Sequence, residues 1–260
     1  MLRSFLARSK TIFIRYLLQQ KITQRRDQAA GFFEIHVVSY CTIVVLYACL
    51  RVVAAYNTLV TITFCNGKGG TGKTTLSVLL ALALKEAGHT VAIEDTDPQK
   101  TATRWVQEVG GIDLAASGLF PVTIIDTPPR LDSPQTLSSL RKASVIVLVT
   151  SPSPADLFTS RDTAALIKRE GLFERARLLY NQVEPGTILS RDLVEMAKRI
   201  GLTPLSNKLH RRQAYQHAVV LGWKSLGPKA KEEALRVALE ITATNNGVRP
   251  AVLSEGRIGV

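Results

Sequence analysis

The chain has 260 residues, of which 46% are hydrophobic and 21% are charged, and this is the composition of a globular protein with a sizeable buried core. Its three cysteines include no C-x-x-C spacing, which argues against a disulfide framework and a zinc site and fits a reducing compartment. The net charge of +12 makes nucleic acid and anionic lipid candidate partners, with ordinary solubility charge as the alternative.

Residues 1–58 form a basic N-terminal extension. Residues 1–60 contain eight Lys and Arg against two acidic residues, which is half of the net charge. The sixteen residues 35–50 carry no formal charge at neutral pH, but a membrane span usually needs about twenty apolar residues. Three interpretations are open: a membrane anchor through residues 32–55 with a cytoplasmic basic flank, a targeting segment, or a mis-assigned start with translation beginning further downstream.

From residue 59 the sequence alternates between short apolar runs, which predict strands, and longer segments with Pro or Gly at their ends, which predict helices. Strands are expected at residues 59–64, 90–95, 121–129, 144–154 and 175–183, and helices at residues 74–88, 98–110, 133–143, 155–171, 189–200, 210–221 and 229–244. Because the strands are apolar on both faces, the pattern predicts an α/β domain over residues 59–245, with a doubly wound, mostly parallel sheet. A flexible tail is expected at residues 246–260.

A glycine-rich loop follows the first strand of this domain and opens its first helix. It satisfies the pattern G-x-x-x-x-G-K-[ST] in the context that makes this phosphate-binding motif credible. Glycines let successive backbone N–H groups point at phosphate oxygens, and the helix N-terminus adds partial positive charge. Lys73 is expected to neutralise the β- and γ-phosphates, Thr74 to ligate Mg²⁺ and Thr75 to hold the α-phosphate. The remaining nucleotide-binding residues of the loop are Gly67, Lys68, Gly69, Gly70, Thr71 and Gly72.

Acidic residues end two of the predicted strands. Asp126 closes the apolar run "VTIID", and open α/β sheets bind ligands at the carboxyl ends of their strands. We therefore expect Asp126 to hold Mg²⁺ through a water, with capping of the following turn as the alternative. Asp97 is the better candidate for orienting an attacking water, and Asp95 is expected to support the loop.

Three motifs in this order, "KGGTGKTT", "DTDPQ" and "IIDTPP", resemble the ParA/MinD family of deviant Walker-type ATPases. The segments "DTDPQKTATRW" and "RRQAYQHAVVLGWKSL" are most similar to small ParA partition ATPases that lack an N-terminal DNA-binding domain. The resemblance covers about residues 60–242. It implies a P-loop NTPase fold, ATP and Mg²⁺ as cofactors, an ATP-dependent homodimer, non-specific DNA binding by that dimer, and hydrolysis stimulated by a ParB-like or other adaptor protein.

The resemblance also implies roles for two further residues. In the family, the lysine that matches Lys68 reaches across the dimer to the nucleotide of the other subunit, which supplies charge compensation in trans. Lys68 is thus a candidate catalytic residue together with Lys73 and Asp97, and a solvated loop lysine is the alternative. Asn181 follows a strand where related ATPases use an Asn to recognise adenine, with a turn-forming Asn as the alternative.

Basic residues cluster in the sequence around the last predicted helices, where they could contact DNA phosphates without base-specific contacts. The candidate DNA contacts are Lys208, Arg211, Arg212 and Lys224. A solvated helix face is nearly as good an explanation for any one of them, and Arg212 is alternatively a structural residue.

Other branches of the superfamily lack support in this sequence. No Cys follows Cys65, which argues against an iron–sulfur carrier, and the C-terminal residues show no basic amphipathic helix of the MinD type. The sequence therefore predicts a cytoplasmic, nucleoid-associated ATPase that positions or segregates plasmid or chromosomal DNA. The alternatives are an ATPase that positions a protein cargo on the nucleoid and a membrane-tethered regulatory ATPase.

Overall fold

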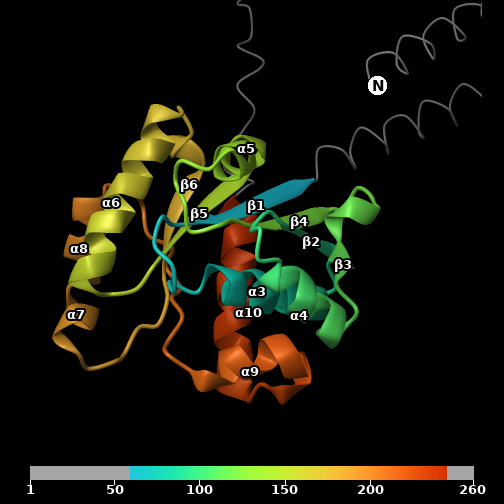
Figure 1. Ribbon diagram of the computed structural model, residues 1–260. Helices are drawn as coiled ribbons and strands as arrows, with labels where there is room; N and C mark the ends of the chain where they lie inside the picture. Colours follow the sequence, from blue (N-terminus) through green and yellow to red (C-terminus); the bar gives the residue numbers. More distant parts are fainter. Residues whose placement is uncertain (1–58, 245–260) are drawn as a thin grey trace, which may run out of the picture. The chain divides into compact units, whose positions relative to one another are not determined.

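The computed structural model describes residues 59–244, and a six-stranded sheet lies at the centre of this part of the chain (Figure 1). The strands are β1 (Val60–Cys65), β2 (Val91–Asp95), β3 (Asp113–Leu114), β4 (Val122–Asp126), β5 (Val145–Thr150) and β6 (Ala176–Tyr180). They lie in the order β3-β2-β4-β1-β5-β6, and every neighbouring pair is parallel. The predicted α/β fold with a parallel sheet is confirmed.

Helices cover both faces of the sheet. The α-helices are α3 (Lys73–Glu86), α4 (Thr101–Val109), α5 (Pro134–Lys142), α6 (Pro154–Arg169), α7 (Ile188–Arg191), α8 (Leu193–Ile200), α9 (Gln213–Leu221) and α10 (Pro228–Thr244), and the 3₁₀ turns are η1 (Ala115–Ser117), η2 (Phe173–Arg175) and η3 (Trp223–Ser225). α3 leads from β1 to β2, whereas α5 and α6 lead toward β5 and β6 in the opposite direction. Right-handed crossovers in opposite directions place their helices on opposite faces. The ligand-binding edge of such a doubly wound sheet lies where the two directions diverge, at the carboxyl ends of its central strands.

Alternate residues of β5 enter two separate apolar cores. In β5, Val145, Val147 and Val149 pack into the core that contains α3 and α10, while Ile146 and Leu148 pack into the core that contains α6 and α8. α3 is in turn covered by α9 and α10 (Figure 1). The helix that follows the glycine-rich loop is therefore held on two sides, which fixes the position of its N-terminus.

Three predicted helices differ from those in the structure, two by a later start and one by an interruption. The helix expected from residue 98 begins at Thr101, because Asp97 Oδ1 accepts the N–H of Gln99 (2.9 Å) and Lys100 has a left-handed φ of 54°. Because of these contacts, the residues directly before Thr101 form a turn and not the first turn of the helix. The helix expected at residues 189–200 is divided into α7 and α8 at Asp192.

The helix expected from residue 210 begins at Gln213, because the chain before it pairs with another segment. His210 forms a parallel bridge with Val183, and the N–H of Arg211 donates to the Val183 oxygen (3.0 Å). The two-residue strand β3 was not predicted, since two residues are too few to show an alternating pattern.

Among residues 59–244, no helix has both the length and the apolar character that crossing a membrane requires. The predictions for residues 1–58, including the anchor at residues 32–55, and for the tail at residues 246–260 fall outside the described residues.

Glu240 of α10 fixes the segment that follows α8. It accepts the N–H groups of Ser206 (2.6 Å) and Asn207 (2.9 Å) and the side-chain amide of Asn207 (2.7 Å). Burial acts to raise the pKa of Glu240, but these hydrogen bonds outweigh it and hold the pKa below its usual range. Its stabilising effect is therefore present above the unfolded-state pKa of about 4.5 and is lost as the pH falls through the lower folded-state pKa.

We expect Glu240→Gln to lower the free energy of unfolding by about 1–2 kcal/mol at pH 7, because hydrogen bonds to a charged acceptor are lost. Below pH 4 the variant and the wild type should become more alike in stability. Urea unfolding of the full chain at pH 7 and pH 3.5 measures both effects, with Glu232→Gln as the control on an exposed face of the same helix. A difference between variant and wild type that stays constant with pH would contradict this account.

Candidate nucleotide-binding site

The glycine-rich loop connects β1 to α3 at the carboxyl edge of the sheet. Gly70 and Gly72 have φ values of 79° and 95°, which glycine adopts without strain. A Cβ atom on Gly72 would also collide with the side-chain amide nitrogen of Asn181. Gly67 packs against Leu131, where a Cβ would lie 2.8 Å from Cγ. The loop therefore requires Gly72 both for its backbone conformation and for space.

Lys73 is the first residue of α3, and only 6% of it is exposed. Its Nζ donates to the backbone oxygen of Lys68 (3.0 Å), so the ammonium bridges the two ends of the loop. Burial lowers the pKa of Lys73, and the negative charges of Asp126 and Asp97 oppose that shift. An ammonium has three donors, and two of them remain for a phosphate that enters the loop.

Asp126 ends β4 and is fully buried. Its Oδ1 accepts a hydrogen bond from the Ser77 hydroxyl (3.1 Å), and the nearby Thr74 hydroxyl acts to lower the pKa of the carboxyl group. Burial raises the pKa of Asp126 to about 7. Its Oδ2 is buried and has no hydrogen-bond partner among the described residues.

These features fit the requirements of Mg²⁺. The ion binds through one or two protein oxygens together with phosphate and water, and a buried carboxylate oxygen without a partner beside a threonine hydroxyl supplies the protein part. Within residues 59–244, no group of three or more His, Cys, Asp or Glu side chains is placed to hold a metal by itself. The residues therefore fit a Mg²⁺ that arrives with a nucleotide.

The two acidic residues at the end of β2 differ in their surroundings. Asp95 is nearly buried and accepts the N–H of Asp97 (3.1 Å) and both the N–H (2.9 Å) and the hydroxyl (3.1 Å) of Thr103. Asp97 is half-buried, and among the described residues its side chain accepts one hydrogen bond, from the N–H of Gln99 to Oδ1 (2.9 Å). Asp95 thus stabilises the turn into α4, and Asp97 keeps acceptor capacity for a water or ligand.

Lys68 extends away from the position of Lys73. Its Nζ forms an ion pair with Oδ1 of Asp156 in the first turn of α6, and its side chain is 40% exposed. Its backbone N–H donates to the side-chain oxygen of Asn66 (3.0 Å). The loop therefore presents its two lysines at two different places.

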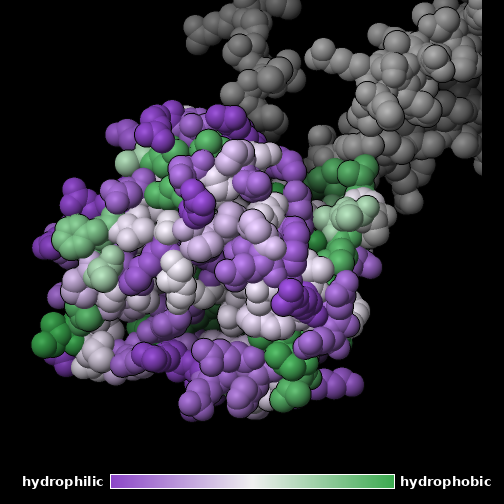
Figure 2. All heavy atoms as spheres, in the orientation of Figure 1, coloured by the Kyte–Doolittle hydropathy of each residue, from purple (hydrophilic) through white to green (hydrophobic). Residues whose placement is uncertain are grey.

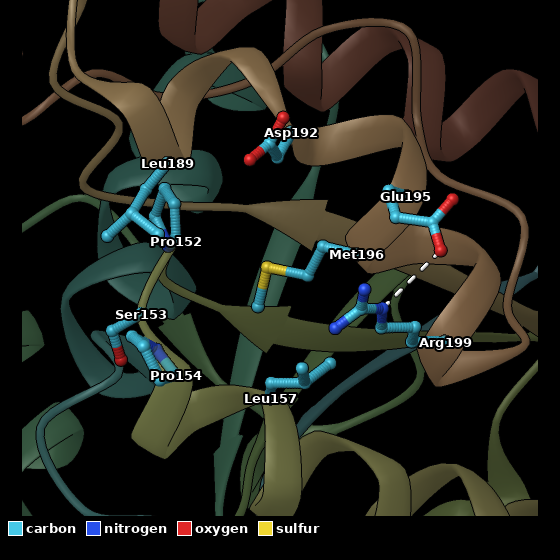
Figure 3. Close-up of a pocket in the computed structure, with 9 residues that line it drawn as sticks. All are labelled: Pro152, Ser153, Pro154, Leu157, Leu189, Asp192, Glu195, Met196 and Arg199. Atoms are coloured by element: carbon cyan, nitrogen blue, oxygen red, sulfur yellow. Dashed lines mark hydrogen bonds and ion pairs between the residues drawn. The ribbon is translucent and has the colours of Figure 1, made fainter.

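The start of α6 that carries Asp156 also forms one wall of a groove (Figure 3). Leu157 of α6 lies opposite Met196 of α8, whose side chain points into the groove, and Glu195 pairs with Arg199 (3.4 Å) at the rim. The remaining lining residues are Pro152, Ser153, Pro154, Leu189 and Asp192.

Asn181 follows β6 and is 6% exposed. Its Nδ2 donates to the backbone oxygen of Thr71 (2.9 Å), so the side chain is bonded to the glycine-rich loop itself. Gln182 adds a second bond to this loop, from Nε2 to the oxygen of Gly70 (3.3 Å). The Thr71 hydroxyl is buried and has no partner in the described part of the chain. Asn181 thus supports the loop here, and its predicted contact with adenine stays a prediction.

The other predicted nucleotide-binding residues lie in the glycine-rich loop and in the first turn of α3. Gly69 and Gly70 are exposed, and Thr74 and Thr75 are half-buried in the first turn of α3. The sequence analysis missed Ser77, Asp156 and Gln182. A signal existed for Asp156, because "SPSPAD" places a helix cap at Ser153 and an acidic residue three positions later.

The candidate DNA contacts fall into two groups. Arg211 pairs with Glu184 (3.0 Å), and Arg212 pairs with Glu233 (3.0 Å). Lys208 and Lys224 form no ion pair with any described residue, and Lys224 is exposed in η3. Figure 2 shows both hydrophilic and hydrophobic residues on the surface near the neighbouring α9, in which Val220 and Leu221 are exposed. The lysines are thus free to meet a phosphate without first breaking an ion pair.

The parallel sheet, the glycine-rich loop and the buried carboxylate together define a nucleotide-binding protein of the P-loop class. The chain belongs to the family whose model is described as the CobQ/CobB/MinD/ParA nucleotide binding domain, which matches residues 62–222. This confirms the resemblance to the ParA/MinD ATPases.

Two curated relatives are similar to the chain. A "Maintenance of carboxysome distribution protein A" from Halothiobacillus neapolitanus is 30% identical over an alignment of 190 residues, with 65% of this chain and 87% of the relative covered. A protein of the same name from Gloeobacter kilaueensis is 31% identical over 201 residues, covering 68% of this chain and 91% of the relative.

Solved structures confirm the fold. The ATP complex of a Cyanothece McdA variant superposes with a TM-score of 0.57 at 16% identity, over 75% of this chain and 99% of the other. A septum site-determining MinD from Pyrococcus horikoshii, complexed with Mg-ADP, gives a TM-score of 0.54 at 17% identity, over 70% of this chain and 96% of the other. The first of these structures holds ATP and the second holds Mg-ADP, which agrees with the expected cofactors ATP and Mg²⁺.

Proposed function

We propose that this chain closes a homodimer around Mg-ATP, binds DNA without sequence preference in that state, and uses ATP hydrolysis to position a cargo. The observation that carries the proposal is the separation of the two loop lysines. Lys73 is buried within its own loop, whereas Lys68 reaches to α6 and is 40% exposed. One lysine serves the nucleotide of its own subunit, and the other is available to the phosphates of a second subunit.

The proposed division of roles follows from the site. Lys73, Thr75 and the loop N–H groups bind the triphosphate, while Thr74 and Asp126 hold Mg²⁺. When bound, Mg²⁺ would neutralise part of the phosphate charge. Asp97 orients the attacking water from the end of β2, and hydrolysis, stimulated by an adaptor protein, returns the dimer to monomers with lower DNA affinity.

The cargo is proposed to be a protein assembly, which was the alternative to DNA partition in the sequence analysis. Both curated relatives are named for carboxysome distribution and match over most of their length. Plasmid partition is named for a solved structure from Borrelia burgdorferi that is 16% identical, and this level of identity supports the fold alone.

A gene deletion in the source organism distinguishes the two cargoes. Loss of the gene should cluster a fluorescently labelled protein assembly while plasmids are retained at the normal frequency. Plasmid loss with normally spaced assemblies would reject the protein cargo and favour DNA partition. Membrane fractionation of the full chain tests the third possibility, a tethered regulatory ATPase.

The DNA-binding step is tested with the full chain in the presence of ATP, ADP or no nucleotide, over a salt titration. Binding to DNA of any sequence should occur with ATP alone, and it should weaken steeply as salt rises, because bound cations release counterions from the phosphates. The absence of DNA binding in every nucleotide state would contradict a nucleoid-based cycle.

Lys224 is the residue for which the structure predicts a direct effect on that binding. We expect Lys224→Ala to weaken binding of the ATP state about three- to tenfold and to reduce the salt slope by about one, since one phosphate contact is lost. Lys198→Ala on α8 is the control, because Lys198 is an exposed lysine on the opposite side of the sheet. Equal effects of the two substitutions would mean that net charge, and not this surface, determines binding.

A further inference from the structure

We propose that Asp156 is a positioning residue for Lys68: it holds the ammonium on its own subunit until the phosphates of a second subunit take its place. The inference rests on the proposed ATP-dependent dimer. Asp156 competes with the phosphates of the second subunit for the ammonium of Lys68.

Asp156 is placed as a fixed acceptor. Its side chain is 4% exposed, and its Oδ2 accepts hydrogen bonds from both the backbone N–H (3.2 Å) and the hydroxyl of Ser151. Its own N–H donates to the capping oxygen of Ser153 (3.1 Å). With one oxygen bonded to Ser151 and the backbone held in the first turn of α6, the carboxylate presents only Oδ1 to Lys68.

The backbone of Lys68 is fixed equally well. Its N–H donates to Asn66, which is buried and in turn donates from Nδ2 to the backbone oxygen of Val149 (2.7 Å). Its carbonyl oxygen accepts from Nζ of Lys73 (3.0 Å). The flexible part is the four-carbon side chain, so the ammonium can change partners while the loop keeps its shape.

The ion pair opposes the release of Lys68. Burial acts to raise the pKa of Asp156, but the hydrogen bonds from Lys68 and Ser151 outweigh it and lower the pKa, so the group is a carboxylate at neutral pH. When Lys68 leaves, this nearly buried charge loses its cationic partner, which is unfavourable. Dimer closure must therefore offer Lys68 a better acceptor, and the phosphates of ATP have the charge to do so.

The test measures the dimer dissociation constant of the full chain with ATP by sedimentation equilibrium. Asp156→Asn removes the charge and keeps an oxygen for the bonds from Ser151, so Lys68 is released and the dissociation constant should fall about three- to tenfold. Asp156→Glu restores the charge and should bring the constant back toward the wild-type value. Glu170→Gln is the matched control, because it removes a carboxylate from an ion pair (2.8 Å) at the other end of the same helix.

Two further measurements separate positioning from a structural role. In a Lys68→Ala background, Asp156→Asn should no longer change the dissociation constant. In the nucleotide-free chain, mass spectrometry should show faster acylation of Lys68 by an amine-reactive ester in Asp156→Asn than in the wild type, with thermal unfolding confirming that both are folded.

The inference would be overturned if Asp156→Asn left the dissociation constant unchanged or raised it. It would also be overturned if Asp156→Asn lowered the constant equally in the Lys68→Ala background, or if Lys68 were acylated at the same rate in Asp156→Asn and in the wild type. A wild-type chain that stays monomeric with ATP would instead reject the proposed function, and the release step with it.

Discussion

Lys73→Ala should weaken ATP binding by at least about 100-fold, because it removes the only buried cation that contacts the glycine-rich loop within the described residues. Its ammonium donates one hydrogen bond to the Lys68 carbonyl and keeps two donors, so a phosphate that enters the loop gains charge-assisted hydrogen bonds. The full chain and the variant are compared by calorimetric titration with Mg-ATP. The variant should still fold, since burial of the ammonium is itself costly and only one carbonyl loses its partner.

The control for this prediction is Lys142→Ala, which removes an ion-paired lysine (2.8 Å from Glu94) outside the loop. ATP affinity should be unchanged in this control. If Lys73→Ala bound ATP as tightly as the wild type, the glycine-rich loop would not be the phosphate site.

Asp126→Asn should reduce Mg²⁺-dependent ATP hydrolysis by at least about 100-fold, which is the loss typical of an electrostatic contact made at the reacting phosphates. The substitution keeps the size of the side chain and an oxygen for the bond from Ser77, but the carboxylate charge that Mg²⁺ needs is lost. Steady-state phosphate release over a Mg²⁺ titration measures the effect. ATP binding without Mg²⁺ should change much less.

Asp132→Asn serves as the control, since Asp132 is an exposed carboxylate paired with Arg130 (3.2 Å) in the segment after β4. Wild-type hydrolysis and Mg²⁺ dependence in Asp126→Asn would mean that the unpartnered Oδ2 belongs to a structural carboxyl group, and the metal assignment would fail.

The sequence by itself determined the features that are local in the chain. The apolar runs that became β1, β4 and β5, the glycine-rich loop and the carboxylate at the end of β4 all lie in continuous segments, and their periodicity and composition predict them without a partner. The doubly wound parallel fold followed from the order of these segments, because such strands must be covered on both faces. Helix starts were less predictable where a tertiary contact decided them, as at Gln213.

Only the tertiary structure decided which residues share a contact across long stretches of chain. Lys68 meets Asp156 from 88 residues away, Asn181 bonds to Thr71 from 110 residues away, and Arg212 meets Glu233 from 21 residues away. A predicted trans-acting lysine thus has a partner in its own subunit, and a predicted base contact is bonded to the loop. The physical reason is that crossovers on opposite faces bring the ends of separate strands to one edge of the sheet, and no local sequence pattern specifies which side chains then meet there.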